Sequence, residues 1–126
     1  MSPDKEKLLT DTFPILYRDI HRPMIENLVL FGFECENGWF GIIWDLSEKL
    51  SSLNEDILAM QVKEKYGSLR FYISSGSNKA FDLIDEAETK SRSTCEICGK
   101  AGKIRRRGTW LKTLCDVHYL EWISKK

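Results

Sequence analysis

The sequence predicts an α+β protein, a helical body with one β-hairpin followed by a small C-terminal module, and three patterns lead to this prediction. The first is an apolar stripe at helical spacing from Trp39 to Leu53. The second is a pair of segments with alternating character, 60–66 and 69–73, on either side of a turn. The third is two short pairs of Cys and His residues after position 94.

Helices are expected in four parts of the body, one of them a short segment through Leu16 and Ile20. The apolar stripe has steps of four, three, four and three residues and reads as a core-facing helix: Trp39, Ile43, Leu46, Leu50 and Leu53. A short helix is expected at residues 4–9, and another around Phe81, with Ser77 or Asn78 as its N-cap. The stretch 28–33 is nearly all apolar, so either a helix or a buried strand fits it.

The expected hairpin has one core-facing and one solvent-facing side. Alternation places four residues of the first strand on one face: Met60, Val62, Glu64 and Tyr66. Gly67-Ser68 is expected to form a two-residue turn that begins with glycine. We interpret Lys63–Arg70 as a structural hairpin, with a surface for a partner as the alternative.

Charge divides the chain into two parts. Residues 1–94 carry 11 Lys+Arg and 16 Asp+Glu, whereas residues 95–126 carry 8 and 3, so net charges of −5 and +5 cancel. The polar stretch 90–94 reads as a linker, and we place a boundary there between an acidic α+β body (1–94) and a basic module (95–126). The basic part predicts an acidic partner: nucleic acid, an acidic protein surface, or the body of the same chain.

Composition favours a soluble protein of the cytoplasm. The hydrophobic content of 42% and the charged content of 30% are ordinary for a globular domain. No apolar run approaches the roughly 18 residues of a membrane helix, and residues 1–6 are polar, unlike a signal peptide. We therefore expect no membrane contact and no disulfide framework. Cys35, alone in an apolar stretch, is expected to be a buried, inert thiol.

Four residues near the C-terminal end have the spacing of a zinc site. Cys95 and Cys98 are separated by two residues, as are Cys115 and His118, and a gap of 16 residues joins the pairs. Zinc takes four sulfur or nitrogen ligands at the corners of a tetrahedron, and two such pairs fill them. With no position left for water, the sequence predicts one structural Zn²⁺ that stabilises a module too small to hold a core alone.

The residues between the pairs complete the layout of a treble-clef zinc finger, which segment 95–126 resembles. Gly99 allows a turn with positive φ after the first pair, and two short strands, 103–107 and 109–114, can follow. A helix then opens at the second pair with three apolar residues on one side: Val117, Leu120 and Ile123. A redox dithiol at the first pair and ordinary core cysteines are the alternatives; a redox pair of this kind usually opens a helix in a thioredoxin-like fold, which is absent here.

The sequence gives little support to an enzyme. Nucleases of the HNH type resemble the zinc segment but need further histidines as general base and as metal ligands. The hairpin 102–111 has no histidine, and the other histidine of the chain, His21, lies in a polar segment where an exposed or capping role fits better. We also find no phosphate-binding glycine loop and no nucleophile elbow.

Basic residues and one tryptophan gather on the hairpin of the module, and they are candidates for contact with nucleic acid or a partner: Lys103, Arg105, Arg106, Arg107, Trp110 and Lys112. Arginine forks suit phosphates, and an aromatic ring can stack on a base. Alternation along a strand, however, points Arg105 and Arg107 to one side and Arg106 to the other. A solvated edge or a surface that docks on the acidic body is the alternative.

Three segments together look like a group of small, mostly uncharacterised phage and prophage proteins: residues 31–40 (FGFECENGWF), 61–72 (QVKEKYGSLRFY) and 110–118 (WLKTLCDVH). The resemblance implies a bacterial or phage cytoplasm and a protein that acts by binding rather than by chemistry; it supplies no catalytic residue. We therefore expect a non-enzymatic zinc-binding protein that binds a host protein or assembly, as an anti-defence or regulatory inhibitor. The alternative function is a nucleic-acid-binding accessory protein that uses the basic hairpin.

Overall fold

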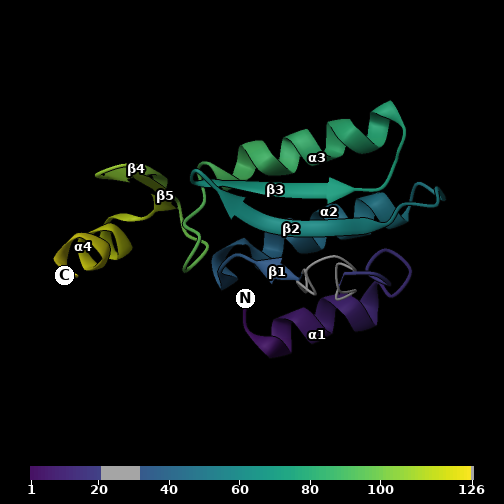
Figure 1. Ribbon diagram of the computed structural model, residues 1–126, viewed down its shortest axis with the longest axis horizontal. Helices are drawn as coiled ribbons and strands as arrows, with labels where there is room; N and C mark the ends of the chain where they lie inside the picture. Colours follow the sequence, from purple (N-terminus) through teal and green to yellow (C-terminus); the bar gives the residue numbers. More distant parts are fainter. Residues whose placement is uncertain (21–31, 126) are drawn as a thin grey trace, which may run out of the picture.

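A computed structural model describes residues 1–20 and 32–125 of the chain, and within them the predicted α+β class is confirmed (Figure 1). His21 and most of the apolar stretch 28–33 lie outside the described residues. The described elements follow one another along the chain: α1 (Pro3–Thr12), β1 (Phe33–Glu34), a 3-10 turn η1 (Asn37–Trp39), α2 (Phe40–Ser51), β2 (Ala59–Lys65), β3 (Ser68–Ile73), α3 (Asn78–Ser91), β4 (Lys103–Arg107), β5 (Trp110–Leu114) and α4 (Asp116–Ser124).

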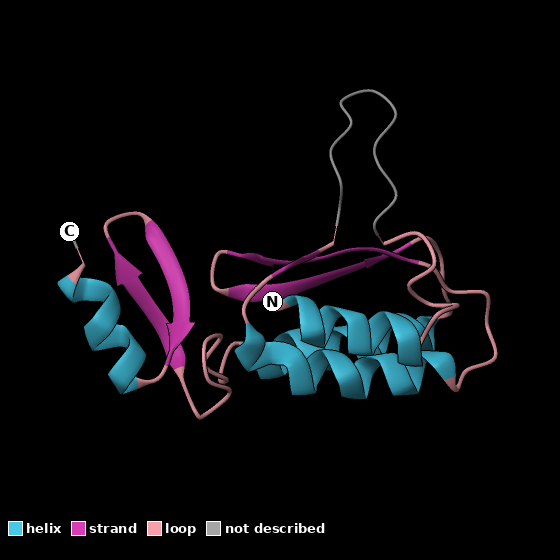
Figure 2. Ribbon diagram, turned by 90° about the horizontal axis from the view of Figure 1, so that it is seen from below, coloured by secondary structure: helices cyan, strands magenta, loops and turns pink. Residues whose placement is uncertain are grey.

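The body is a three-stranded sheet with its helices on one side (Figure 2). The strand order is β1-β2-β3, with β1 parallel and β3 antiparallel to β2. The apolar stripe of α2 packs on the sheet, and its residues Ile43, Leu46 and Leu50 are buried with Val62 of β2. A short β1 extends the predicted hairpin; sequence reasoning did not find it, because two residues are too few for an alternating pattern to appear.

The helix α3 covers the open edge of the sheet. The backbone N–H of Leu69 donates to Ser91 Oγ at 2.9 Å, and that of Phe71 donates to Glu88 Oε2 at 3.0 Å. Both donors belong to β3, whose outer edge would otherwise present unpaired groups. The predicted N-cap is confirmed, since the Ser77 side chain accepts from the N–H of Ala80.

The turn between β2 and β3 differs from the prediction by one residue. Lys65 pairs with Ser68, so the turn residues are Tyr66 and Gly67, with φ of 54° and 82°. Two left-handed residues form the turn type that matches the right-handed twist of the strands. A shift of register between Ala59 and Gln61 also turns Met60 toward solvent, so the predicted face that joined Met60, Val62, Glu64 and Tyr66 is wrong at both ends.

The last three elements form the C-terminal module, residues 95–125, in which β4 and β5 pair antiparallel and α4 follows (Figure 1). The predicted order of turn, hairpin and helix is therefore present. The second strand starts at Trp110 rather than at residue 109, because Gly108, with φ of 61°, and Thr109 make the turn. None of the helices in the described part of the chain is long and apolar enough to cross a membrane.

Candidate metal centre and the surfaces around it

The fold brings the four predicted ligands together. Cys95 and Cys98 lie on the turn before β4, Cys115 is the N-cap of α4, and His118 lies in the first turn of that helix. Their candidate ligand atoms all lie within 4.8 Å of one another. All four cysteines of the chain, each within the described residues, are free thiols, so this cluster can hold a metal ion.

The histidine presents one particular ring nitrogen to the cysteines. His118 Nδ1 lies 3.2 Å from Cys115 Sγ and 3.5 Å from Cys95 Sγ, and Cys98 Sγ lies 3.8 Å from Cys115 Sγ. The second ring nitrogen, Nε2, lies 4.0 Å from Glu121 Oε2. A proton on Nε2 would point toward that carboxylate and leave Nδ1 free to bind a metal, an arrangement common at histidine ligands.

Backbone N–H groups prepare the cluster for a cation by favouring thiolates. Burial alone raises the pKa of Cys95, but hydrogen bonds from the backbone at Cys115, Cys98 and Ile97 outweigh it and lower that pKa to about 6. The N–H of His118 points at Cys115 Sγ from 3.5 Å and lowers the pKa of that thiol as well. Thiolates are the form that binds metal, so the backbone favours ligation.

The turn that carries the first pair is also the place where the module joins the body. The N–H of Gly38 donates to the Glu96 carbonyl at 2.6 Å, and Trp39 Nε1 donates to the Thr94 carbonyl at 2.9 Å. A Cβ on Gly38 would lie 2.1 Å from the Cys95 carbonyl oxygen, so only glycine permits this approach. A metal ligand and the docking contact therefore share one piece of backbone.

A second contact joins the module to the turn of the body hairpin. Thr113 Oγ1 donates to the Gly67 carbonyl at 2.5 Å, and the backbone of Lys112 packs against Gly67. Thr113 is fully buried there. The two contacts are linked through the backbone, because the N–H of Glu96 donates to the Thr113 carbonyl at 3.0 Å.

Glu96 is a buried carboxylate that the sequence analysis did not select. Its side chain is 2% exposed; Oε2 accepts from the N–H of Glu36 at 3.1 Å, and Oε1 has no hydrogen-bond partner among the described residues. Burial raises the pKa of this carboxyl, and Lys112 opposes the shift. A glutamate between two cysteines reads as exposed, and only the approach of Gly38 shows otherwise.

The three arginines of the basic hairpin lie on two different sides of it, as alternation along a strand predicts. Arg105 donates to the Leu114 carbonyl at 3.1 Å and to Asp116 at 2.6 Å, and its guanidinium lies 4.6 Å from the Tyr119 ring. Arg107 donates to the carbonyls of Trp122 and Lys125 at the end of α4. Both arginines therefore hold α4 against the hairpin. The remaining candidates are the exposed Lys103, Arg106 and Trp110 and the half-buried Lys112.

The apolar side of α4 faces solvent. All nine residues of α4 are described, and none of them is buried. The three residues of its predicted apolar side, Val117, Leu120 and Ile123, are 63%, 60% and 43% exposed. The sequence placed them correctly on one side of a helix, but it gave no sign that this side lacks a partner within the chain.

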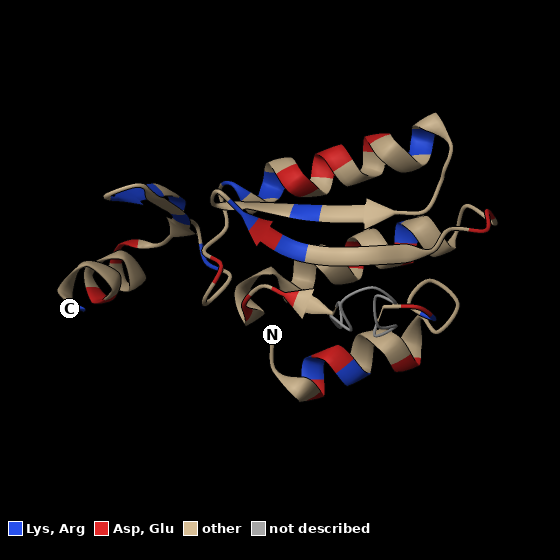
Figure 3. Ribbon diagram, in the orientation of Figure 1, with Lys and Arg blue, Asp and Glu red and all other residues tan. Residues whose placement is uncertain are grey.

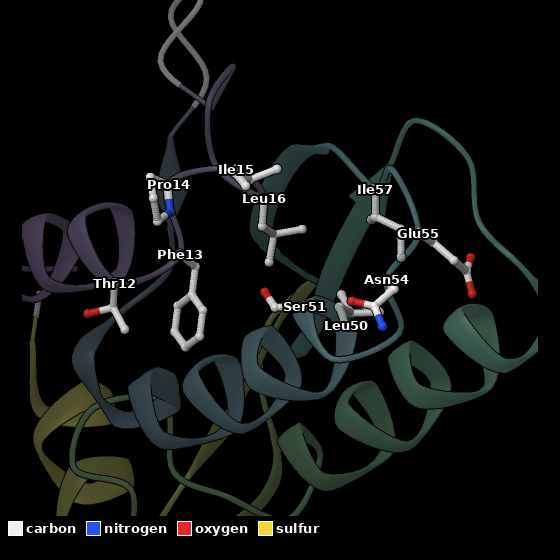
Figure 4. Close-up of a pocket in the computed structure, with 10 residues that line it drawn as sticks. All are labelled: Thr12, Phe13, Pro14, Ile15, Leu16, Leu50, Ser51, Asn54, Glu55 and Ile57. Carbon is white, nitrogen blue, oxygen red and sulfur yellow. The ribbon is translucent and has the colours of Figure 1, made fainter.

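A hollow of about 300 Å³ lies in the body between the end of α1 and the end of α2 (Figure 4). Its wall is largely apolar, with Phe13 and Leu16 opposite Leu50 and Ile57. The carboxylate of Glu55 points away from these apolar side chains, and both its oxygens accept hydrogen bonds from Ser77. We assign this hollow to packing around the core.

Comparisons with protein-family models, with curated proteins and with solved structures each found no match.

Proposed function

We propose that this chain is a non-enzymatic zinc protein of phage or prophage type that binds a host protein or assembly in the bacterial cytoplasm, with the exposed apolar side of α4 as its contact surface. The exposure of Val117, Leu120 and Ile123 carries this proposal. Free cysteines in place of disulfides agree with a reducing compartment, and the phage context rests on the sequence resemblance.

The ligand set and its spacing support zinc as the metal. A tetrahedral zinc with sulfur ligands at about 2.3 Å places two sulfurs about 3.8 Å apart. The distance between Cys98 Sγ and Cys115 Sγ is 3.8 Å, which matches this geometry. Three cysteines and one histidine are a standard structural zinc set. The ion would hold the turn at Cys95 and the start of α4 together, since each supplies two ligands.

The side chains of α4 support a protein as the partner. Positions 117, 120 and 123 form a stripe on one side of a helix, the pattern with which helices enter apolar grooves. Trp122 and Tyr119 of the same helix are half-buried, so the helix has a side for its own hairpin and a side for solvent. Two of the three arginines proposed for nucleic acid are occupied by α4 itself, which weakens the alternative function in its original form.

Elemental analysis tests the zinc part. We expect about one zinc per purified chain, with loss of the ion in Cys95→Ser. Bound iron or an absence of metal, with thiols oxidised in pairs, would contradict the assignment.

Retention of host proteins tests the surface. The full chain and two variants, Leu120→Glu and the control Ile15→Glu, are immobilised and exposed to bacterial lysate; Ile15 is 70% exposed on the body. A protein that the parent and the control retain but Leu120→Glu loses, and that binds the parent again when purified, supports the proposal. If Leu120→Glu retains the same host protein as the parent, the proposed surface is contradicted. The proposal is also contradicted if sedimentation shows a dimer of the parent chain that Leu120→Glu abolishes, because the surface then binds a second copy of the chain.

A further inference from the structure

Two hairpin turns, one from the body and one from the module, meet around a groove with an exposed aromatic side chain on each side. The groove has a volume of about 360 Å³ and is lined by five residues: Glu64, Tyr66, Thr109, Trp110 and Leu111. Tyr66 is 68% exposed and Trp110 is 71% exposed. We call this feature the junction groove; no contiguous segment of the sequence contains it.

The body side of the junction groove is held in an unusual backbone conformation. Tyr66 has φ of 54°, in the left-handed region that side chains other than Gly, Asn and Asp rarely adopt. The turn is fastened at both backbone groups of Gly67: its N–H donates to Glu64 Oε2 at 2.7 Å, and its carbonyl accepts from Thr113 Oγ1. A rigid turn thus presents an aromatic ring to water at a position that asparagine would fill with less strain, and such outliers cluster at binding sites.

Cations approach the groove from both hairpins. On β2, Lys65 is exposed, and its Nζ lies 5.7 Å from the centroid of the Tyr66 ring. On β4, Arg106 is exposed and pairs with Leu111 of the groove. In Figure 3, segments coloured blue for Lys and Arg lie at the end of the body sheet that faces the module and on the module itself. The acid of the groove, Glu64, is engaged by the turn through Gly67.

We propose that the junction groove binds single-stranded nucleic acid, with Tyr66 and Trp110 stacking on bases and Lys65 and Arg106 at phosphates. Aromatic platforms beside a basic path are the features with which proteins hold single strands without reading their sequence. A duplex keeps its bases stacked inside and offers no faces to these rings. The rings alone would also suit a proline-rich peptide, but cations on both hairpins favour a polyanion.

This surface is separate from the apolar side of α4 and is independent of the proposed protein contact. It also differs from the nucleic-acid site that the sequence predicted, because Arg105 and Arg107 take no part in it and Tyr66, from the body, does. Docking of the module on the body, through Thr113 at Gly67, brings Trp110 to Tyr66.

Fluorescence anisotropy with labelled dT12 and rU12 tests the proposal on the intact zinc-loaded chain at low salt. Tyr66→Asn removes the ring but leaves Asn-Gly, the sequence this turn prefers, and Trp110→Thr keeps a strand former. We expect each to weaken binding about tenfold, while Phe81→Ala, at an exposed aromatic on α3, leaves binding unchanged. Removing two phosphate contacts with Lys65→Gln and Arg106→Gln should reduce the salt slope of log K by roughly 1.4.

Melting temperatures and metal content of the variants establish that each is folded. An absence of binding to both oligonucleotides at 20 mM salt or so overturns the proposal. Binding that survives both Tyr66→Asn and Trp110→Thr places the contact elsewhere and overturns it too. A polyproline peptide that binds with the same dependence on the two rings, and without a salt slope, would make the groove a peptide site instead.

Discussion

In the body, buried apolar residues run from Leu9 in α1 to Ala87 in α3 as one cluster, whereas in the C-terminal module the helix α4 buries none of its described residues. The buried residues of the module are few: Cys95, Glu96, Thr113 and Leu114. All of these lie near the metal cluster or the contacts with the body. The body thus has an apolar core of its own, whereas the module has a Cys/His cluster that can hold a metal ion and polar contacts with the body at Gly38 and Gly67.

Removal of the metal should show this difference most strongly. Chelation or Cys95→Ser should unfold residues 95–125 and leave the body sheet and helices in place, because binding of structural zinc supplies on the order of 10 kcal/mol to such modules. Amide NMR spectra would show module signals collapsing to random-coil positions while body signals persist. Cooperative loss of both parts would contradict the division and make the docking contacts essential to the body.

A smaller effect is expected where the two parts touch. Gly38→Ala places a methyl group 2.1 Å from the Cys95 carbonyl, so the module must shift, and we expect a loss of about 2 kcal/mol in the free energy of unfolding. The matched control is Gly41→Ala in α2, where a Cβ meets nothing within 4 Å; helix propensity predicts a gain of roughly 0.5–1 kcal/mol. Denaturant unfolding of the zinc-loaded variants measures both. Equal effects of the two substitutions would show that the module does not dock through this glycine.

The smallest expected effect is a difference in reactivity between the Cys35 thiol of the body and the three thiols of the module. Burial raises the pKa of Cys35 in the body to about 12, so alkylation at pH 8 should spare it even after chelation exposes the three cysteines of the module. Mass spectrometry should count three modifications with chelator and a fourth only in denaturant. Because the folded state holds this proton more tightly than an ordinary thiol of pKa 9.0, its contribution to stability is present below pH 9 and is lost as the pH rises toward 12. Rapid modification of Cys35 in native protein would show that the core around it opens.

Local patterns in the sequence were enough for the fold class, the helix of the apolar stripe, the N-cap at Ser77 and the four clustered ligands. The helix and its N-cap depend on residues a few positions apart, which is the range over which periodicity and capping act, and each ligand pair is likewise local although 16 residues separate the two pairs. The turn at Tyr66-Gly67 was missed by one residue, because tyrosine in a left-handed conformation gives no signal in composition.

Tertiary structure alone decided how the two parts meet. Glu96 is buried because Gly38, 58 positions away along the printed sequence, lets the backbones touch, and Arg105 turns to Asp116 rather than to an outside phosphate. Tyr66 and Trp110 share a groove because the module docks on the body, through Thr113 at the body turn and through Glu96 at Gly38. The sequence by itself determined which residues can bind a metal, since ligand spacing is local; which side chains remain for a partner depends on long-range packing that no local pattern encodes.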